Sequence, residues 1–190
     1  MIQVLQKVVH QELPIEKDTK IIGKRFSVKR RKTKRRRKKM SKEKVVICSG
    51  YFDPLHVGHL EYFKMAKDLG DTLVVIINNR EQCLLKKGDE FMDEKDRLEI
   101  VFHLDMVDET ILSVDEDKSV CKSLELIAQF KPHAELIFCN GGDRNFGEVP
   151  ETKVCGKLGI KMVDGLGDKI RSSSDMTGLV EYDEPNAFRR

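Results

Sequence analysis

The stretch Gly50-Tyr51-Phe52-Asp53-Pro54-Leu55-His56-Val57-Gly58-His59-Leu60 decides the fold of this chain. An apolar, β-branched run at residues 45–49 precedes it and predicts a buried strand, and apolar residues at helical spacing follow it as far as Gly70. The stretch therefore forms a turn from a strand into a helix. In an open α/β sheet the free amides and positive dipole end of such a helix face the crevice where ligands bind, so a phosphate is expected there.

The residue types in this turn suit a phosphate site. His56 and His59 are three residues apart, so on a helix they lie on one face and can point at the same phosphoryl group. Gly58 has no Cβ and allows close approach of a nucleotide to the backbone, and Pro54 fixes the entry to the turn. Two alternatives stay open: the histidines are zinc ligands, or one of them is a hydrogen-bonded polar residue near the core.

The pattern G-x-F-D-P-x-H-x-G-H resembles the H-x-G-H signature of the nucleotidyltransferase superfamily, which includes cytidylyltransferases and several adenylyltransferases. The resemblance covers roughly residues 45–179 and is nearest the glycerol-3-phosphate cytidylyltransferase and heptose-1-phosphate adenylyltransferase branch. It implies that His56 and His59 stabilise charge on the α-phosphate while an acceptor oxygen displaces pyrophosphate. The turn residues expected to bind the nucleotide are Gly50, Tyr51, Phe52, Asp53 and Gly58.

Beyond this turn, strand patterns and helix patterns alternate. Strands are predicted at residues 45–49, 72–77, 107–114, 135–139 and 160–163, and helices at 60–69, 93–104, 118–130, 150–158 and 172–180. Strands alternating with helices indicate an α/β fold with a Rossmann-like, doubly wound, parallel five-stranded sheet. We expect one domain over residues 45–181, followed by a flexible tail at 182–190.

Basic residues after the second strand are candidates for binding the acceptor. Lys86 and Lys87 precede Gly88 in a segment that we interpret as a loop, where an ammonium group can contact a phosphate. The resemblance implies catalytic roles for both lysines, with Lys87 and Arg97 contacting substrate. A pair of solvated lysines and a surface ion pair of Arg97 are the alternatives.

Two later loops resemble nucleotide-binding loops of the same superfamily. Gly142, Asp143 and Arg144 lie after the fourth strand in a motif similar to its G-G-D loop. The second group precedes and opens the last helix, where serine hydroxyls cap free amides, and resembles the superfamily's I-S-S-T motif. Its expected phosphate ligands are Lys169, Arg171, Ser172, Ser173 and Ser174. The basic residue that the superfamily carries downstream is absent, and Arg171 or Lys169 is the candidate to replace it.

The charge is divided unevenly along the chain. Residues 1–44 hold 17 Lys and Arg and 4 Asp and Glu, a net charge of +13, whereas the remaining 18 basic and 28 acidic residues give −10. The basic extension, residues 1–44, peaks at residues 29–39, and its self-repulsion predicts disorder. We interpret the extension as a nuclear localisation signal or as a segment that contacts a polyanion. The alternative is that the true start is Met40 and the preceding residues belong to an over-extended gene model.

We expect an intracellular, cytoplasmic protein, because no apolar run approaches the length of a transmembrane span, with a nuclear location if the basic extension is translated. No cysteine pair has metal-ligand spacing, so the five cysteines are interpreted as reduced thiols and no protein metal site is expected. The predicted activity is transfer of a nucleotidyl group from CTP or ATP to a phosphorylated alcohol or sugar, with Mg²⁺ accompanying the triphosphate, in a possible homodimer. The alternative is a noncatalytic nucleotide-binding module tethered to RNA or another polyanion by the basic extension.

Overall fold

The computed structural model describes residues 42–141, 149–167 and 173–179. The chain divides into two units, Met1–Lys38 and Lys39–Arg190. The first unit, with most of the basic extension, lies outside the described residues, so the prediction of disorder there is not addressed. The fold described below belongs to the second unit.

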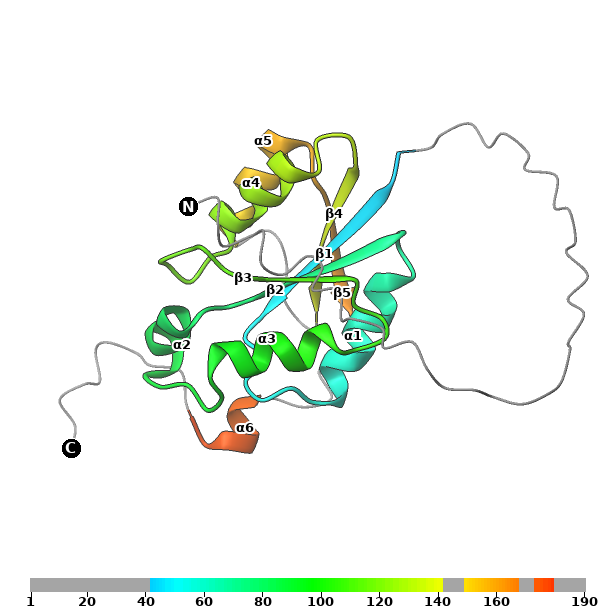
Figure 1. Ribbon diagram of the computed structural model, residues 1–190. Coiled ribbons are helices and arrows are strands. Elements are labelled where there is room, and N and C mark those ends of the chain that lie inside the picture. Colours follow the sequence, from blue (N-terminus) through cyan, green and yellow to red (C-terminus); the bar gives the residue numbers. More distant parts are fainter. Residues whose placement is uncertain (1–41, 142–148, 168–172, 180–190) are drawn as a thin grey trace, which may run out of the picture. The chain divides into compact units, whose positions relative to one another are not determined.

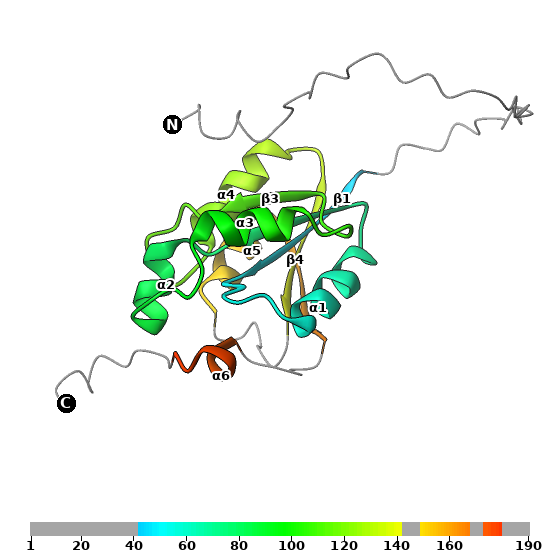
Figure 2. The same ribbon diagram turned by 60° about the horizontal axis from the view of Figure 1, so that its bottom comes forward.

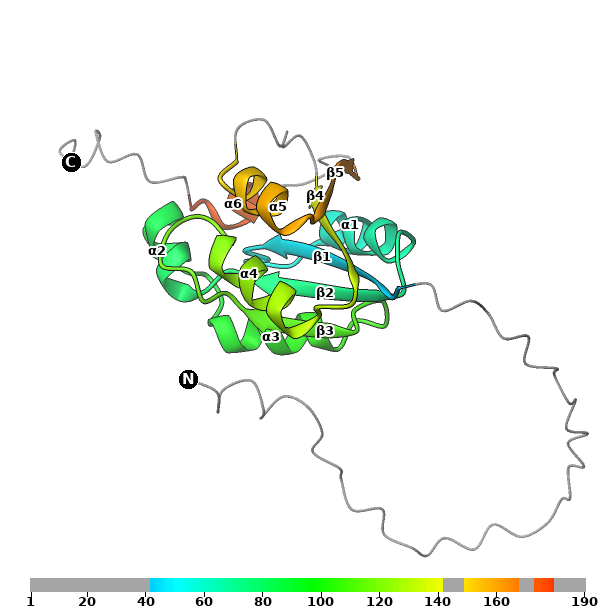
Figure 3. The ribbon, with the colours of Figure 1, turned by 90° about the horizontal axis from the view of Figure 1, so that it is seen from above.

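Strands and helices alternate along the described residues. The strands are β1 (Lys44–Gly50), β2 (Thr72–Ile77), β3 (Glu109–Leu112), β4 (Glu135–Gly141) and β5 (Lys161–Leu166). The helices are α1 (Val57–Lys67), α2 (Arg80–Lys87), α3 (Glu94–Phe102), α4 (Cys121–Phe130), α5 (Glu151–Leu158) and α6 (Ser173–Thr177). All strand pairs are parallel and follow the order β3-β2-β1-β4-β5 (Figure 3). This confirms the predicted doubly wound, five-stranded parallel sheet.

Each face of the sheet buries its own core. Figure 1 shows α1 and α3 on one side of the sheet and α4 and α5 on the other. Phe63 of α1 and Val101 of α3 pack against one set of strand residues, and Leu124 of α4 and Cys155 of α5 pack against the alternate set. Because both faces are covered, the central strands are almost wholly apolar, which is why their sequences read as continuous hydrophobic runs.

The order of the strands places a switch point at the carboxyl end of β1. From β1 the chain winds outward through β2 to β3, and it then crosses back to β4 and β5 on the other side. In α/β proteins with this topology, ligands bind in a crevice at such a switch point. The turn that carries both histidines begins here.

The prediction was wrong between β2 and α3, where a loop was expected and the structure has helix α2. Asn79 caps this helix by accepting the N–H of Gln82, and Gly88 ends it in the left-handed conformation at φ 76°. The helix was hidden because two of its three buried residues, Gln82 and Lys87, are polar. Helical spacing of apolar residues cannot reveal such a helix.

Candidate active site

The turn between β1 and α1 has an unusual backbone that brings both histidines to the start of the helix. Phe52 has a positive φ of 50°, a strained conformation for a bulky residue, and the Asp53–Pro54 peptide bond is cis. His56 is the residue before the first turn of α1, and His59 lies within that turn. A bulky residue with positive φ, such as Phe52, persists where the surrounding packing holds it, and such residues cluster at functional sites.

The two imidazole rings are stacked. Their centroids are 3.7 Å apart and their planes differ by 17°. The backbone N–H of His56 donates to Nδ1 of His59 at 3.3 Å. Because this bond needs a lone pair on Nδ1, the ring proton of neutral His59 lies on Nε2, which leaves that N–H to donate to a ligand.

The environment of His59 disfavours its charged form. Burial, together with the nearby positive charge of His56 and Lys87, lowers the pKa of His59 from 6.5 to about 3. At neutral pH this ring is therefore an uncharged hydrogen-bond donor in the free protein.

The ring of Phe52 packs against the ring of His59. Its side chain is 2% exposed, and its ring meets His59 and Phe63 edge to face, each at 5.0 Å between centroids. A Cβ on Gly50 would lie 2.7 Å from Cζ of Phe52, so this ring position requires glycine at residue 50. The sequence prediction that both residues bind nucleotide is untested, and the packing adds a supporting role for each.

Asp53 and Lys87 hold the turn from inside the protein. The two carboxylate oxygens of Asp53 accept the backbone N–H groups of Phe91 and Met92 at 3.0 and 2.7 Å, and the residue is fully buried. Lys87 donates its ammonium group to the backbone oxygen of Asp53 at 2.9 Å. Asp53 and Lys87 were predicted to contact ligands, but here their polar atoms are already used in hydrogen bonds that hold the turn in place. We call such contacts braces.

Arg97 forms a second brace. Its guanidinium donates to the backbone oxygens of Tyr51 at 2.8 Å, Asn78 at 2.7 Å and Met92 at 3.0 Å, and the residue is 1% exposed. It thus ties the ends of β1 and β2 to the segment before α3. The predicted substrate contact of Arg97 remains a prediction, and in this arrangement the side chain shapes the site through the backbone that it holds.

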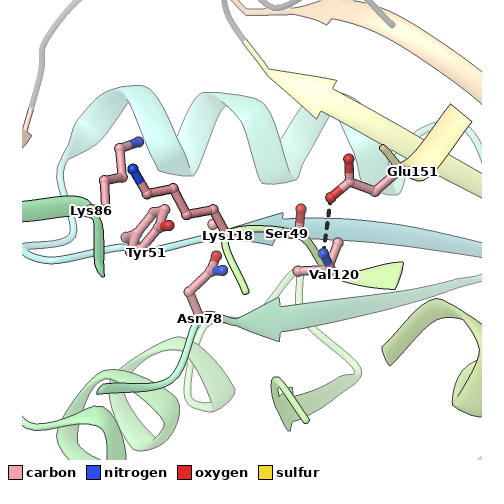
Figure 4. A pocket seen from close by; sticks show the side chains of 8 residues that line it. Ser49, Tyr51, Asn78, Lys86, Lys118, Val120 and Glu151 are labelled. Atoms are coloured by element: carbon pink, nitrogen blue, oxygen red, sulfur yellow. Dashed lines mark hydrogen bonds between the residues drawn. The ribbon is translucent and has the colours of Figure 1, made fainter. Parts of the chain in front are cut away.

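Lys86 lines a pocket, whereas its neighbour Lys87 is buried against Asp53. The ammonium group of Lys86 lies 4.6 Å from the centre of the Tyr51 ring, at the edge of this small open pocket of about 120 Å³ (Figure 4). Lys118 and Glu151 also line this pocket. Neither was predicted from the sequence. The available signal was Asp117-Lys118-Ser119, because Asp and Ser at this spacing favour a tight turn that presents the middle residue.

The last serine motif is only partly described. Ser173 donates its hydroxyl to the backbone oxygen of Pro54 at 3.0 Å, which places α6 beside the histidine turn (Figure 2). Ser174 lies within α6, although its side chain is not described. The other predicted residues of the two loops, Gly142, Asp143, Arg144, Lys169, Arg171 and Ser172, lie outside the described residues.

Two further predictions concern metals and membranes. Over residues 42–141, 149–167 and 173–179, no three His, Cys, Asp or Glu side chains are grouped so as to hold a metal ion. Within the same ranges, every helix is too short or too polar to cross a membrane. All five cysteines are unpaired, and only Cys121 among them is not fully buried.

Comparison with known proteins identifies the family. Residues 47–153, more than half of the chain, match the family described as cytidylyltransferase-like. These residues extend from β1 through the histidine turn to the start of α5, and thus include every brace described above. The chain belongs to the cytidylyltransferase-like family.

Several relatives are similar over most of the described unit. The bifunctional protein HldE of Pelobacter propionicus is 33% identical over 138 residues, which are 72% of this chain and 25% of that protein. The FAD synthase of Thermococcus sibiricus is 37% identical over 102 residues, 53% of this chain and 64% of that protein. The chain thus spans a quarter of the first relative and under two thirds of the second. The crystal structure of the lipopolysaccharide core biosynthesis protein from Thermoplasma volcanium is 28% identical, with a TM-score of 0.52, and the match covers 74% of this chain and 99% of that one.

Proposed function

We propose that this protein is a nucleotidyltransferase that transfers the nucleotidyl group of CTP or ATP to the phosphate of a small phosphorylated alcohol or sugar. An acceptor phosphate oxygen forms a bond to the α-phosphorus, and the bond from that phosphorus to the bridging oxygen of the β-phosphate breaks. Pyrophosphate leaves with the electron pair of the broken bond. No covalent intermediate with the protein is needed.

The observation that carries the proposal is the stacked pair of histidines at the amino end of α1. His59 presents its Nε2–H as a neutral donor, and the helix start adds free backbone amides, so negative charge that develops on the α-phosphate meets prearranged donors. The braces at Asp53, Lys87 and Arg97 hold this arrangement before the substrate arrives. Positioning and electrostatic stabilisation of this kind are what phosphoryl-group chemistry chiefly requires.

We also infer that Mg²⁺ enters with the triphosphate. The described residues lack a cluster that would hold the ion alone, and this suits a metal that keeps its water molecules and is bound mainly by substrate phosphates. When bound, the ion would neutralise part of the charge on the leaving pyrophosphate. It would also offset the net charge of −10 over residues 45–190.

The test is pyrophosphate release by the full chain. CTP, ATP, GTP and UTP are each combined with glycerol 3-phosphate, sugar 1-phosphates, phosphocholine, phosphoethanolamine and nicotinamide mononucleotide. Flavin mononucleotide joins the panel because one relative is an FAD synthase. We expect release for one pair, with turnover in His59→Ala lower by about 10² or more, the scale of losing a prearranged donor.

His103→Ala is the matched control, because this histidine is exposed at the end of α3 and hydrogen-bonds only locally, to Glu99. Its turnover should stay within twofold of the wild type. A His59→Ala protein with nearly normal turnover would overturn the mechanism. Binding of a triphosphate without pyrophosphate release for any pair would instead favour the noncatalytic module, and a steep loss of polyanion affinity with salt would strengthen that alternative.

A further inference from the structure

A small pocket lies beyond the carboxyl ends of β1 and β2 and shares part of its wall with the histidine turn. The end of β1 lines it through Ser49, Gly50 and Tyr51, and Asn78 lines it from the end of β2. Among the described residues, neither His56 nor His59 contributes to its wall. Because Gly50 and Tyr51 belong to both the pocket wall and the histidine turn, a ligand in this pocket would be a neighbour of a triphosphate at the histidines.

Two lysines from different elements reach this pocket. Lys86 comes from the last turn of α2 and Lys118 from the turn before α4. Figure 4 shows both side chains extending toward the same end of the pocket, beside the Tyr51 ring. Two ammonium groups brought together repel each other, and an anion bound between them removes that repulsion. This end of the pocket therefore suits an anionic group.

The position of Lys118 is fixed by a buried amide. Gln82 is 0% exposed, and its Nε2 donates to the backbone oxygens of Asp117 and Ser119, both at 2.6 Å. Its Oε1 accepts from the side chain of Asn78 at 2.9 Å and from the backbone of Asn79 at 3.1 Å. All four hydrogen-bonding positions of this amide are therefore used. The buried side chain of Gln82 thus holds the turn that carries Lys118.

The other end of the pocket offers a fixed carboxylate. Oε1 of Glu151 accepts the backbone N–H of Val120 at 2.9 Å, which holds the side chain against the start of α4. Figure 4 places Glu151 at the end away from the two lysines. A carboxylate accepts hydrogen bonds from hydroxyl groups, so the pocket suits a ligand with an anion at one end and hydroxyl groups at the other.

We propose that Lys118, with Lys86, binds the phosphate of the acceptor, and that Glu151 accepts hydrogen bonds from the hydroxyl groups of its body. Lys118 is then a residue that selects the acceptor, and Gln82 positions it. The ligand class is a phosphomonoester of a hydroxylated small molecule. This inference rests on the proposed function and adds to it the place where the acceptor binds.

The first test uses the full chain and the acceptor that the panel identifies. Lys118→Ala should raise the KM for the acceptor about tenfold or more, the effect of losing roughly 1.4 kcal/mol of binding, and leave the KM for the triphosphate within twofold. The control is Lys122→Ala, which removes another exposed lysine, one that pairs with Glu116 at 3.8 Å. An unchanged acceptor KM, or an equal rise in the triphosphate KM, would overturn the inference. Thermal unfolding of Lys118→Ala should match that of the wild type, because the side chain is exposed.

The second test needs no turnover and separates this inference from the proposed function. Inorganic phosphate is titrated by calorimetry into the full-length wild type, Lys118→Ala, Lys122→Ala and His59→Ala, without nucleotide. The affinity should fall about fivefold or more in Lys118→Ala, a loss on the scale of one charged contact, and stay within twofold in Lys122→Ala. His59→Ala reports separately on phosphate held at the histidine turn. Any phosphate bound by the basic extension is common to all four proteins. Equal affinity in Lys118→Ala and the wild type would refute the subsite even if nucleotidyl transfer were established.

Discussion

The ammonium group of Lys87 lies 2.9 Å from the backbone oxygen of Asp53 and 3.8 Å from its carboxylate, with both side chains almost fully buried. This contact joins the last turn of α2 to the turn that carries the histidines. Lys86, the residue before Lys87 in the chain, lines the pocket instead. Two adjacent lysines with the same chemistry therefore have different surroundings, one inside the protein and one at the pocket.

Replacing each lysine by methionine should reveal this difference. Lys87→Met leaves Asp53 without its buried cation, so we expect it to lower the free energy of unfolding by about 3–5 kcal/mol. Lys86→Met removes a cation from the face of the Tyr51 ring, so it should lower the free energy of unfolding by no more than about 1 kcal/mol. Urea unfolding of both variants measures the difference. Similar losses in the two variants would contradict the assigned roles.

The sheet and the histidine turn could be predicted because each rests on local sequence. Buried strands read as apolar runs, and the turn needs Gly50, Pro54 and the two histidines close together in the chain. The braces and the pocket could not be predicted in the same way. Nothing in the sequence distinguishes Lys86 from Lys87, because their directions depend on packing between α2 and the turn. Likewise Arg97 and Lys118 acquire their surroundings from segments distant in the chain.

Gly50→Ala should disturb the site through Phe52. The added Cβ would lie 2.7 Å from a ring that is already packed between His59 and Phe63, so the ring has to move. We expect a loss of about 1–3 kcal/mol in unfolding free energy, typical of overpacking, together with reduced turnover. Thermal or urea unfolding and the pyrophosphate assay measure the two effects.

Gly156→Ala is the matched control, because Gly156 lies within α5 and an added Cβ there meets nothing within 4 Å. Alanine is the better helix former, so this change should raise the unfolding free energy by about 0.5–1 kcal/mol and leave turnover alone. A destabilised Gly156→Ala, or an unaffected Gly50→Ala, would contradict this account of the packing.

Arg97→Lys tests whether this residue braces the backbone or contacts the acceptor. A lysine keeps the charge but cannot reproduce the planar fork that reaches three backbone oxygens, so at least one buried carbonyl loses its donor. We expect the unfolding free energy to fall by about 2 kcal/mol or more. The control is Arg80→Lys. Arg80 is largely exposed and pairs with Glu90, a mostly buried carboxylate that also lies 3.6 Å from Arg97, so this change should alter the unfolding free energy by less than about 1 kcal/mol. A raised acceptor KM with unchanged stability would assign Arg97 to the substrate instead.

The lowered pKa of His59 makes stability depend on pH in a defined direction. Above pH 6.5 the ring is neutral in both the folded and the unfolded chain, so the shift has no effect. Between about 6.5 and 3 only the unfolded chain binds the proton, so stability falls as the pH falls, by up to about 1.4 kcal/mol per pH unit. In His59→Asn this contribution is absent. The difference in unfolding free energy between wild type and variant should therefore shift by about 2 kcal/mol against the wild type from pH 7.5 to pH 5. A difference that stays constant over this range would show that folding does not lower the pKa of His59, and the argument that its surroundings keep the ring neutral would have to be abandoned.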